Sequence, residues 1–467
     1  MSEFDLRALI DEHLGGELDL HAEAVNPQFV RVLRTIGFDK HWQRTSGAYL
    51  FDTDGNRYLD MLGGYGMFAV GRNNPTVRKA LADALELETP NLVQLGVGTL
   101  PAVLAARLLE RAPSSLERVV WVNTGTEAVE AALKLGRAAS GRSRVISADH
   151  AFHGLTLGSL SANGNPEFTD RFGPLLPGFG RVPFNDLGAL EAELQREDVA
   201  VFLIEPVQGK GIVLPDEGYL PGAQELCRRY GTLLCVDEVL TGIGRTGRMF
   251  ACEHFGLEPD LMTVAKSLSG GYVPVGACLT SKAVFDRVFD SMEHAVVHGS
   301  TFAPSDLAMV AGLATLHELD AEDLVARAER TGQLLLERTR PLVERYGVVR
   351  DVRGLGLAWA IEFEEPERGS ASWRVLERIQ AGIFAQLVAV PLFSDHRVLI
   401  QVAGHKQNVL RALPPLTLSE DDVDMFAGAL ESTVAAASRM PRALMRFAVR
   451  AARAGRGSRD RTTAARS

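Results

Sequence analysis

The sequence lacks the cysteine and histidine patterns of disulfide-bonded and metal-binding proteins. Only four of its 467 residues are cysteines, and their spacing includes no CxxC pair. The eleven histidines form no pair with the spacing of a metal site. We therefore predict no metal centre, and we expect the thiols to be buried or idle in a reducing compartment.

Long apolar runs are also missing. No run of about 18 apolar residues occurs, so we expect no membrane-spanning helix. Residues 1–20 are acidic and have no apolar core, so we expect no secretory signal there. With 46% hydrophobic and 23% charged residues, the composition is that of a globular protein and excludes a collagen or a mostly disordered chain. The expected location is cytoplasmic.

Positive charge is scarce except at the end of the chain. The formal net charge is −10, and residues 441–467 hold eight of the 49 basic residues and one of the 59 acidic ones. The first 440 residues therefore carry a net −17, which argues against nucleic-acid binding because phosphates need clustered cations. The pattern in 441–455 predicts a basic amphipathic helix. It would contact an anionic membrane, an acidic partner, or the protein's own acidic body.

The sequence does contain a regular alternation of short apolar runs and helical patterns. Runs that are apolar throughout are typical of strands buried on both faces of a parallel sheet. The predicted strands are 119–123, 145–148, 199–205, 233–237, 261–265 and 275–279. Helical patterns between them, such as 127–139 and 221–230, predict an α/β protein with a mostly parallel sheet covered by helices.

Other elements are predicted on either side of this region. Residues 48–60 predict a β-hairpin around the turn Asp54-Gly55-Asn56, where glycine supplies a positive φ. A long helical stretch is predicted over 305–345. A strand interrupted by Gly354 and Gly356 is predicted over 348–363. The material after 345 is expected to form a second, smaller domain.

Polar features lie where the predicted strands end, which is where open α/β sheets bind ligands. Gly125 and Thr126 open a helix directly after a strand and offer backbone N–H groups, a hydroxyl and a helix dipole to a phosphate. An ordinary capped helix start has the same sequence pattern, so these residues alone fit either interpretation. Asp237, followed by Glu238, ends another strand. Such paired acids bind metal, transfer protons or cap the next element.

Two further features complete this set. Lys266 directly follows a buried strand, where desolvation lowers the pKa of a lysine and suits it to Schiff-base chemistry. Taken alone, Lys266 is better explained as a lysine at a domain edge whose ammonium group reaches solvent. Phe152 and His153 follow the strand at 145–148 and either stack on a planar ligand or belong to the core. Together, the amine, phosphate cradle, carboxylate and aromatic ring are what pyridoxal 5′-phosphate (PLP) requires.

The chain also resembles a known family. Residues 234–247 read Leu-Cys-Val-Asp-Glu-Val-Leu-Thr-Gly-Ile-Gly-Arg-Thr-Gly, and Pro259-Asp260 and Ala265-Lys266 follow. This run is similar to class III aminotransferases, which are PLP enzymes of fold type I and include ornithine, 4-aminobutyrate, putrescine and ω-amine transaminases. The similarity covers about residues 25–435. Further matching motifs begin at Gly55, Asn123, Glu205, Gly299 and Arg411.

The resemblance implies a large domain with a mostly parallel seven-stranded sheet and a smaller α+β domain. We expect residues 1–75 to form an N-terminal segment of the smaller domain and 76–330 to form the large PLP-binding domain. Residues 331–436 are expected to complete the smaller domain, and 437–467 to form the basic tail.

The resemblance also assigns cofactor contacts. It implies that Lys266 holds the cofactor as a Schiff base and then transfers the proton, while Asp237 pairs with the pyridine nitrogen. Phe152 and Val239 would contact opposite faces of the ring. The other implied cofactor contacts are His153, Gly125, Thr126, Glu205 and Thr301. Because Thr301 would act on the neighbouring subunit, a homodimer with shared active sites is implied.

Substrate contacts are implied as well. Arg411 matches the arginine that binds the carboxylate of an amino or keto acid, and Tyr65 and Phe68 lie where the family lines the substrate pocket. These aromatic side chains favour a partly apolar substrate, although each taken singly fits core packing equally well. Lys210 stands where ornithine-type relatives have the glutamate that pairs with the arginine. Arg411 must then swing out to solvent, find another acid, or meet only anionic substrates; the apolar segment favours swinging out.

The predicted function is a transaminase that works by a ping-pong mechanism. Its small-molecule partners would be an ω-amine or aldehyde on one side and an amino or keto acid on the other. The alternative is an aminomutase on the same scaffold, which needs no external amino acceptor. A non-catalytic protein with this fold is disfavoured, because Lys266 and Asp237 are both intact.

Overall fold

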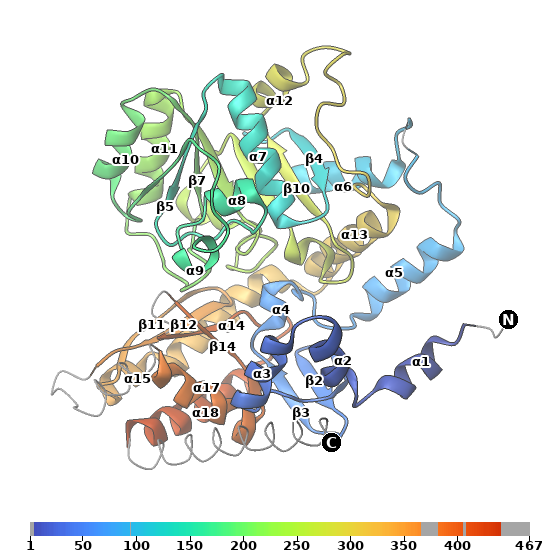
Figure 1. Ribbon diagram of the computed structural model, residues 1–467, viewed down its shortest axis with the longest axis vertical. Helices are drawn as coiled ribbons and strands as arrows, with labels where there is room; N and C mark the ends of the chain where they lie inside the picture. The colour runs from blue at the N-terminus through green and yellow to red at the C-terminus, as the bar shows by residue number, and fades with distance from the viewer. Residues whose placement is uncertain (1–3, 94, 366–381, 405–407, 440–467) are drawn as a thin grey trace, which may run out of the picture.

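Figure 1 shows the computed structural model, in which residues 4–93, 95–365, 382–404 and 408–439 are described. The upper part of the view holds a seven-stranded sheet with its helices. The lower part holds two four-stranded sheets built from both ends of the chain. The predicted basic helix of the tail falls outside the described residues, so it stays a prediction.

The large sheet is mostly parallel, as the alternating pattern predicts. Its strand order is β4-β10-β9-β8-β7-β5-β6, and β10 alone runs antiparallel to its neighbours. The strands are β4 (Arg118–Val122), β5 (Arg144–Ala148), β6 (Phe179–Val182), β7 (Val199–Ile204), β8 (Leu233–Asp237), β9 (Leu261–Val264) and β10 (Gly276–Thr280). All six predicted strands are present. Strand β6 escaped prediction because Gly180 and Arg181 interrupt its apolar pattern at the sheet edge.

Strand β7 shows why these runs are apolar throughout. All six of its residues are buried, and successive side chains point to opposite faces. Val201 and Leu203 pack in the cluster that includes α7 (Gly125–Ser140), whereas Phe202 and Ile204 pack in the cluster on the other face, with α11 (Tyr219–Tyr230). Helix α7 lies so close to the sheet that a Cβ at Gly136 would stand 2.2 Å from Val201 Cγ2.

Further helices surround this sheet. They are α5 (Pro75–Glu86), α6 (Thr99–Leu109), α8 (Leu157–Ser161), α9 (Pro166–Thr169), α10 (Leu187–Leu194) and α12 (Lys282–Val288). The 3₁₀ turns η1 (Ala251–Phe255) and η2 (Lys266–Ser269) lie in the same region.

A small sheet joins the two ends of the chain. The predicted hairpin is present as β2 (Tyr49–Asp52) and β3 (Arg57–Asp60), and Asp52 Oδ1 accepts a 2.8 Å hydrogen bond from Asn56 N in its turn. Strand β1 (Trp42–Ser46) extends it on one side, and β13 (Val398–Leu399) pairs in parallel with β3. The neighbouring helices are α1 (Leu6–His13), α2 (Glu17–Ala24), α3 (Pro27–Ile36) and α4 (Gly63–Gly66).

The second small sheet is antiparallel, with the order β11-β12-β15-β14. The interrupted strand predicted over 348–363 is a hairpin of β11 (Val349–Leu355) and β12 (Ala358–Phe363). It reverses at Gly356, which has a φ of 54°. Strands β14 (Gln401–Ala403) and β15 (Val409–Ala412) complete the sheet, beside α17 (Ile383–His396) and α18 (Glu420–Ser438).

The long helical stretch predicted over 305–345 is three helices. They are α13 (Asp306–Ala321), α14 (Leu324–Thr339) and α15 (Pro341–Arg345). The first break occurs at Asp323, whose φ of 46° is left-handed. The second occurs at Pro341, which has no N–H to continue a helix and so begins a new one.

The four cysteines are all buried and unpaired, as predicted. The domain boundaries after residues 75, 330 and 436 stay predictions. Within the described ranges, no helix combines the length and the apolar character that crossing a membrane requires.

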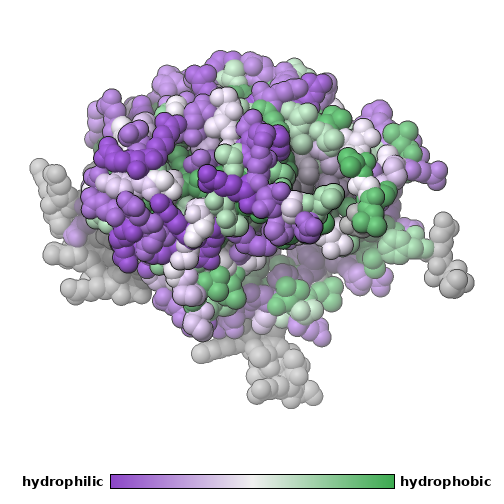
Figure 2. Space-filling model, turned by 90° about the horizontal axis from the view of Figure 1, so that it is seen from above, coloured by the Kyte–Doolittle hydropathy of each residue, from purple (hydrophilic) through white to green (hydrophobic). Residues whose placement is uncertain are grey.

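Apolar side chains are exposed along one side of the molecule. Figure 2 shows them on the right of the view, which is the side of α1, α5 and α6 in Figure 1. The exposed large apolar side chains at the end of α5 and between α5 and α6 are Leu85, Leu87, Val93, Leu95 and Val97. A surface of this kind is typical of a protein–protein contact.

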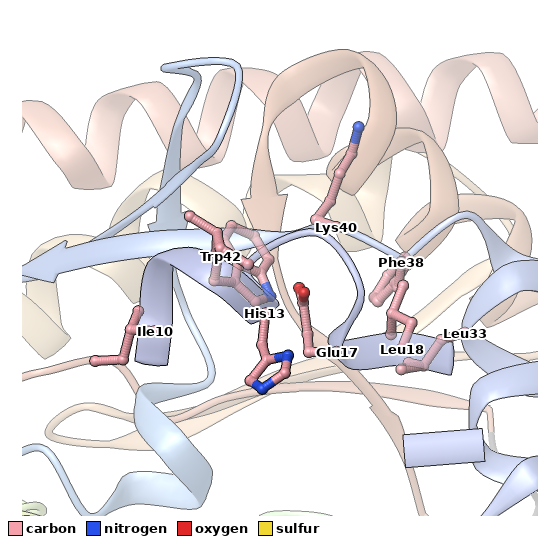
Figure 3. Close-up of a pocket in the computed structure, with 9 residues that line it drawn as sticks. Ile10, His13, Glu17, Leu18, Leu33, Phe38, Lys40 and Trp42 are labelled. Atoms are coloured by element: carbon pink, nitrogen blue, oxygen red, sulfur yellow. The ribbon is translucent and has the colours of Figure 1, made fainter. Parts of the chain in front are cut away.

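An apolar pocket of about 350 Å³ lies between the N-terminal helices and the loop before β1. Figure 3 shows Trp42 and Phe38 on its wall, with His13, Glu17 and Lys40 as its polar groups. None of the residues that line this pocket was predicted to bind cofactor or substrate.

Candidate active site

The predicted site residues meet where three parallel strands end. Asp237 is the last residue of β8, and Lys266 follows the end of the neighbouring β9 by two residues. Glu205 directly follows β7, the strand on the other side of β8. Because the strands are parallel and adjacent, their carboxyl ends place these three side chains at one edge of the sheet.

Asp237 is a buried carboxylate with several donors. Its side chain is 4% exposed, and its Oδ2 lies 2.7 Å from Nδ1 of the buried His153. Thr263 Oγ1 donates to Oδ1 at 2.8 Å, and the Val239 amide donates to it at 3.1 Å. These contacts fix the position of the carboxylate. His153 Nε2 is buried without a partner in the part of the chain that the structure describes.

Glu205 links two loops of the site. Its carboxylate accepts hydrogen bonds from the amides of Phe152, at 3.1 Å, and Gly209, at 2.9 Å. Burial raises the pKa of Glu205 above its ordinary value, although His153 and the two amides oppose this shift. Glu205 therefore joins the Phe152 segment, which follows β5, to the Gly209 segment, which follows β7.

Lys266 has a strained backbone and a perturbed amine. Its φ of 45° lies in the left-handed region, which is unusual for a residue with a side chain and recurs at functional sites. Burial lowers the pKa of its amine to about 8, although Asp237 and Glu205 act to raise it. The next residue, Ser267, donates its hydroxyl to the Gly66 carbonyl at 2.8 Å and so ties the lysine to the substrate-side loop.

The start of α7 forms a cradle for an anion. Thr124 caps the helix, and its Oγ1 accepts from Glu127 N at 3.3 Å. The amides of Gly125 and Thr126, in the first turn, have no intrahelical partner. A Cβ at Gly125 would stand 2.7 Å from Val239 Cγ1, so only glycine allows the helix to begin this close to the end of β8. The free amides and the helix dipole suit a phosphate.

The predicted ring contacts lie beside this cradle. Phe152 is half-buried, and its ring meets the ring of Phe168 edge-on at 5.0 Å between centroids. Val239 follows Asp237 by two residues and packs against Gly125. The hydroxyl of Thr126 lies 2.7 Å from the hydroxyls of Thr156 and Ser159. These two contacts orient the Thr126 side chain at the start of α7.

Arg411 lies on β15 and points toward the same site. Its guanidinium donates to the Gly209 carbonyl and, at 2.5 Å, to Gln401 Oε1. Burial lowers the pKa of Arg411 to about 10. Among the residues that the structure describes, no carboxylate lies within ion-pair distance of Arg411, and its Nε has no partner. In this structure the arginine has neither swung out nor found another acid.

The two predicted aromatic contacts differ in their surroundings. Tyr65 is 51% exposed and has a φ of 62° within α4, and its phenol lies near enough to Arg411 to affect that residue's pKa. Phe68 is packed beneath the Arg72 guanidinium, 4.0 Å from the ring centroid. An added Cβ at Gly271 would stand 2.6 Å from the Phe68 ring. Phe68 therefore supports the loop, whereas Tyr65 is the more accessible of the two.

Lys210 forms an ion pair that its sequence position did not suggest. Its ammonium lies 2.5 Å from Glu167 Oε1 and 5.2 Å from the centroid of Phe168. The side chain is only 13% exposed. The positive charge next to Gly209 is therefore neutralised by an acid from α9 rather than directed at Arg411.

Thr301 lies on an exposed loop between α12 and α13. The hydroxyl of the preceding Ser300 accepts a 2.6 Å hydrogen bond from Asn123 Nδ2, which anchors the loop near the end of β4. Its predicted role toward a neighbouring subunit stays a prediction.

The sequence reasoning missed four residues that shape the site. Thr263 and Ser267 carry no signal beyond their position near Lys266, and Gln401 lies in a segment with no motif. Arg245 is completely buried and donates to the carbonyls of Gly66, Leu357 and Pro414. Burial lowers its pKa to about 9.

The residues present fit PLP. The start of α7 suits a phosphate, Asp237 suits the pyridine nitrogen, and the Lys266 amine suits the aldehyde. Within the described part of the chain, no group of three potential ligands could hold a metal ion. The sheet and this set of groups at its edge define a PLP-dependent enzyme of fold type I.

The comparisons with known proteins extend this assignment. Residues 38–434 match the family described as "Aminotransferase class-III". The chain therefore belongs to the class III aminotransferases, which are PLP-dependent transferases.

Named relatives agree with the family. The putrescine aminotransferase of Pectobacterium atrosepticum is 39% identical over 436 residues, which cover 90% of this chain and 88% of that protein. Aminotransferase PigE of a Serratia species is 36% identical over 88% of this chain, but the chain spans only 52% of PigE. A PLP-bound amine transaminase from an uncultivated Pseudomonas species is 31% identical, with a TM-score of 0.75 over 84% of this chain and 94% of that one. All three are aminotransferases, which does not favour the aminomutase alternative.

Proposed function

We propose that this enzyme moves an amino group between a partly apolar ω-amine or its aldehyde and an amino or keto acid, in two alternating half-reactions. The observation that most directly supports this is the closeness of Lys266 and Arg411, whose positive charge acts to lower the pKa of the lysine. A nucleophilic amine beside an arginine fork suits a site that receives both an amine and a carboxylate.

PLP, when bound, supplies an aldehyde that accepts the amino group and a ring that stabilises negative charge on the substrate carbon. In this proposal Lys266 holds the cofactor covalently, and its neutral amine afterwards carries the proton between the two reacting carbons. Asp237, oriented by Thr263 and His153, holds a proton on the pyridine nitrogen. The amides of Gly125 and Thr126 bind the phosphate.

The remaining residues position the ring and the substrate. Phe152 and Val239 confine the ring from opposite faces, and Glu205 maintains the loops around it. Arg411 binds the carboxylate of the amino or keto acid. Tyr65 provides an apolar surface for the amine, and Phe68 supports that surface from behind.

A panel of donors and acceptors tests the proposal. We expect the holoenzyme to convert pentylamine or 2-phenylethylamine to the aldehyde only when pyruvate or 2-oxoglutarate is supplied, with equal amounts of aldehyde and new amino acid. Chromatography of both products measures this ratio. Turnover of one substrate to its isomer without an acceptor, or no conversion of any pair, would contradict the proposal.

A homodimer with shared active sites belongs to the same proposal. Apolar side chains are exposed on the loop that carries Thr301: Met292 is 91% exposed, Val296 90% and Phe302 69%. Leu95 and Val97, before α6, are almost completely exposed. Large apolar side chains gathered on one surface favour burial against a second copy.

Charge placed on this surface should separate the subunits. We expect light scattering to give twice the chain mass for the wild type and one chain mass for Phe302→Asp combined with Leu95→Asp. Activity should fall with the dimer, because Thr301 would no longer reach its partner. Met425→Asp, which alters an exposed side chain of α18, is the control. A fully active monomer would refute the shared site.

A further inference from the structure

The partners of Arg411 are both neutral. Gln401 and Arg411 are directly opposite each other on the antiparallel strands β14 and β15, so their side chains share one face of the sheet. Gln401 Oε1 accepts from the guanidinium at 2.5 Å, and the Gly209 carbonyl accepts from it as well. These two oxygens come from separate segments and satisfy the same half-buried cation.

The surroundings reinforce this neutral arrangement. Lys210, directly after Gly209, is paired with Glu167, so that carboxylate is engaged elsewhere. The Lys210 carbonyl accepts a 3.0 Å hydrogen bond from the Gly404 amide, which fastens the end of β14 to the segment that holds Arg411. Glu205 faces its own two amide donors. Arg411 therefore contacts a side-chain amide and a backbone carbonyl, and it forms no ion pair with an acid among the described residues.

We propose that Gln401 is a specificity-determining residue that holds Arg411 through a neutral oxygen when the substrate has no carboxylate and releases it when one arrives. This inference rests on the proposed function, in which one pocket receives both kinds of substrate. A carboxylate bonds to a guanidinium about twice as strongly as a neutral oxygen does, so an incoming acid displaces the amide. An apolar amine leaves the Gln401–Arg411 contact intact, and the cation is never left bare.

The same reasoning predicts what an internal acid would do. Gln401→Glu places a carboxylate on Arg411 at the position of the present amide oxygen. A substrate carboxylate must then compete with a charged partner, and its binding should weaken by about 10- to 100-fold, the range for a hydrogen bond between charged groups. Gln401→Ala removes the neutral partner without adding a competitor, so carboxylate binding should be kept or strengthened.

Calorimetric titration of the holoenzyme with glutarate measures this without turnover. Glutarate carries carboxylates but no amino or keto group, so a failure of the proposed transamination would appear in the substrate panel and not here. We expect Arg411→Ala to abolish binding, Gln401→Glu to weaken it by about 10- to 100-fold, and Gln401→Ala to retain it. Gln195→Glu, the same change at an exposed site, should bind like the wild type.

The two half-reactions provide a second readout. For Gln401→Glu, the KM of the keto acid should rise while kcat is retained, and the amine half-reaction should proceed at the wild-type rate. Equal binding of glutarate by the wild type and Gln401→Glu would overturn the inference. So would equal weakening by Gln401→Glu and Gln401→Ala, because Gln401 would then bind the substrate or merely support the strand. Binding that does not depend on Arg411 would overturn it too.

Discussion

Replacement of Lys266 by alanine should lower turnover by at least about 10²- to 10⁴-fold, the range that a positioned proton-transfer group contributes. In the proposed mechanism the lysine both holds the cofactor and carries the proton. The amine makes no hydrogen bond within the described chain, and alanine tolerates the same backbone almost as well as lysine. The variant should therefore fold and still bind the cofactor phosphate.

The attachment of the cofactor can be measured directly. After borohydride reduction, peptide mass spectrometry should find the cofactor on Lys266 in the wild type and nowhere in the Lys266→Ala variant. Lys282→Ala, which alters an exposed lysine on α12, should behave like the wild type. A cofactor adduct on another residue, or a Lys266→Ala variant with normal turnover, would refute the assignment.

The lowered pKa of Lys266 adds a pH dependence to this result. Only the neutral amine attacks an aldehyde, and burial brings the pKa from its usual 10.5 down to about 8. The cofactor-free enzyme should therefore capture PLP faster as the pH rises through about 8 and reach a plateau above it. An unperturbed lysine would keep gaining rate up to about pH 10.

Replacement of Asp237 by asparagine should slow both half-reactions by about 10²-fold, or about 3 kcal/mol, by analogy with the loss of other preorganised electrostatic contacts. Asparagine has nearly the same shape and still accepts from Thr263, but it removes the negative charge that holds a proton on the pyridine nitrogen. The buried His153 would also lose its charged partner. The substitution should therefore lower the thermal stability of the protein as well as the two rates.

A matched aspartate separates these two effects. Asp260 lies just before the amino end of β9, whereas Asp237 lies at the carboxyl end of β8. The Asp260 carboxylate accepts a 2.9 Å hydrogen bond from the Leu234 amide. Asp260→Asn should lower stability and leave kcat unchanged in both half-reactions. Stopped-flow rates and thermal unfolding of both variants test this. Equal kcat values for Asp237→Asn and the wild type would remove Asp237 from the mechanism.

Strands of the large sheet were predictable because burial on both faces requires nearly every residue to be apolar. The runs that became β7, β8 and β9 carry this pattern, and the parallel arrangement then brings their ends together. That is why Asp237 and Lys266 could be placed in one site before the fold was known. Strand β6, at the sheet edge, has no such constraint and was missed.

The surroundings of the substrate-side residues could not be predicted in the same way. The contact between Arg411 and Gln401 depends on the register of β14 and β15, which the residues around them do not reveal. The pairing of Lys210 with Glu167 joins a loop after β7 to the short helix α9. Phe68 supports the loop beneath Arg72 rather than simply facing the pocket, because Gly64 and Gly271 let the backbone approach its ring.

The sequence by itself determined the α/β class and placed Lys266, Asp237 and Gly125 at the ends of strands. These positions follow from local patterns, because apolar runs, helix starts and strand ends are set by neighbouring residues. The family followed from the resemblance of several motifs in order. The tertiary structure alone decided which oxygens meet Arg411, which acid neutralises Lys210, and that Arg245 is buried among three carbonyls. Such contacts join segments that are far apart in the chain. Their chemistry is defined only when strand register and helix packing bring them together.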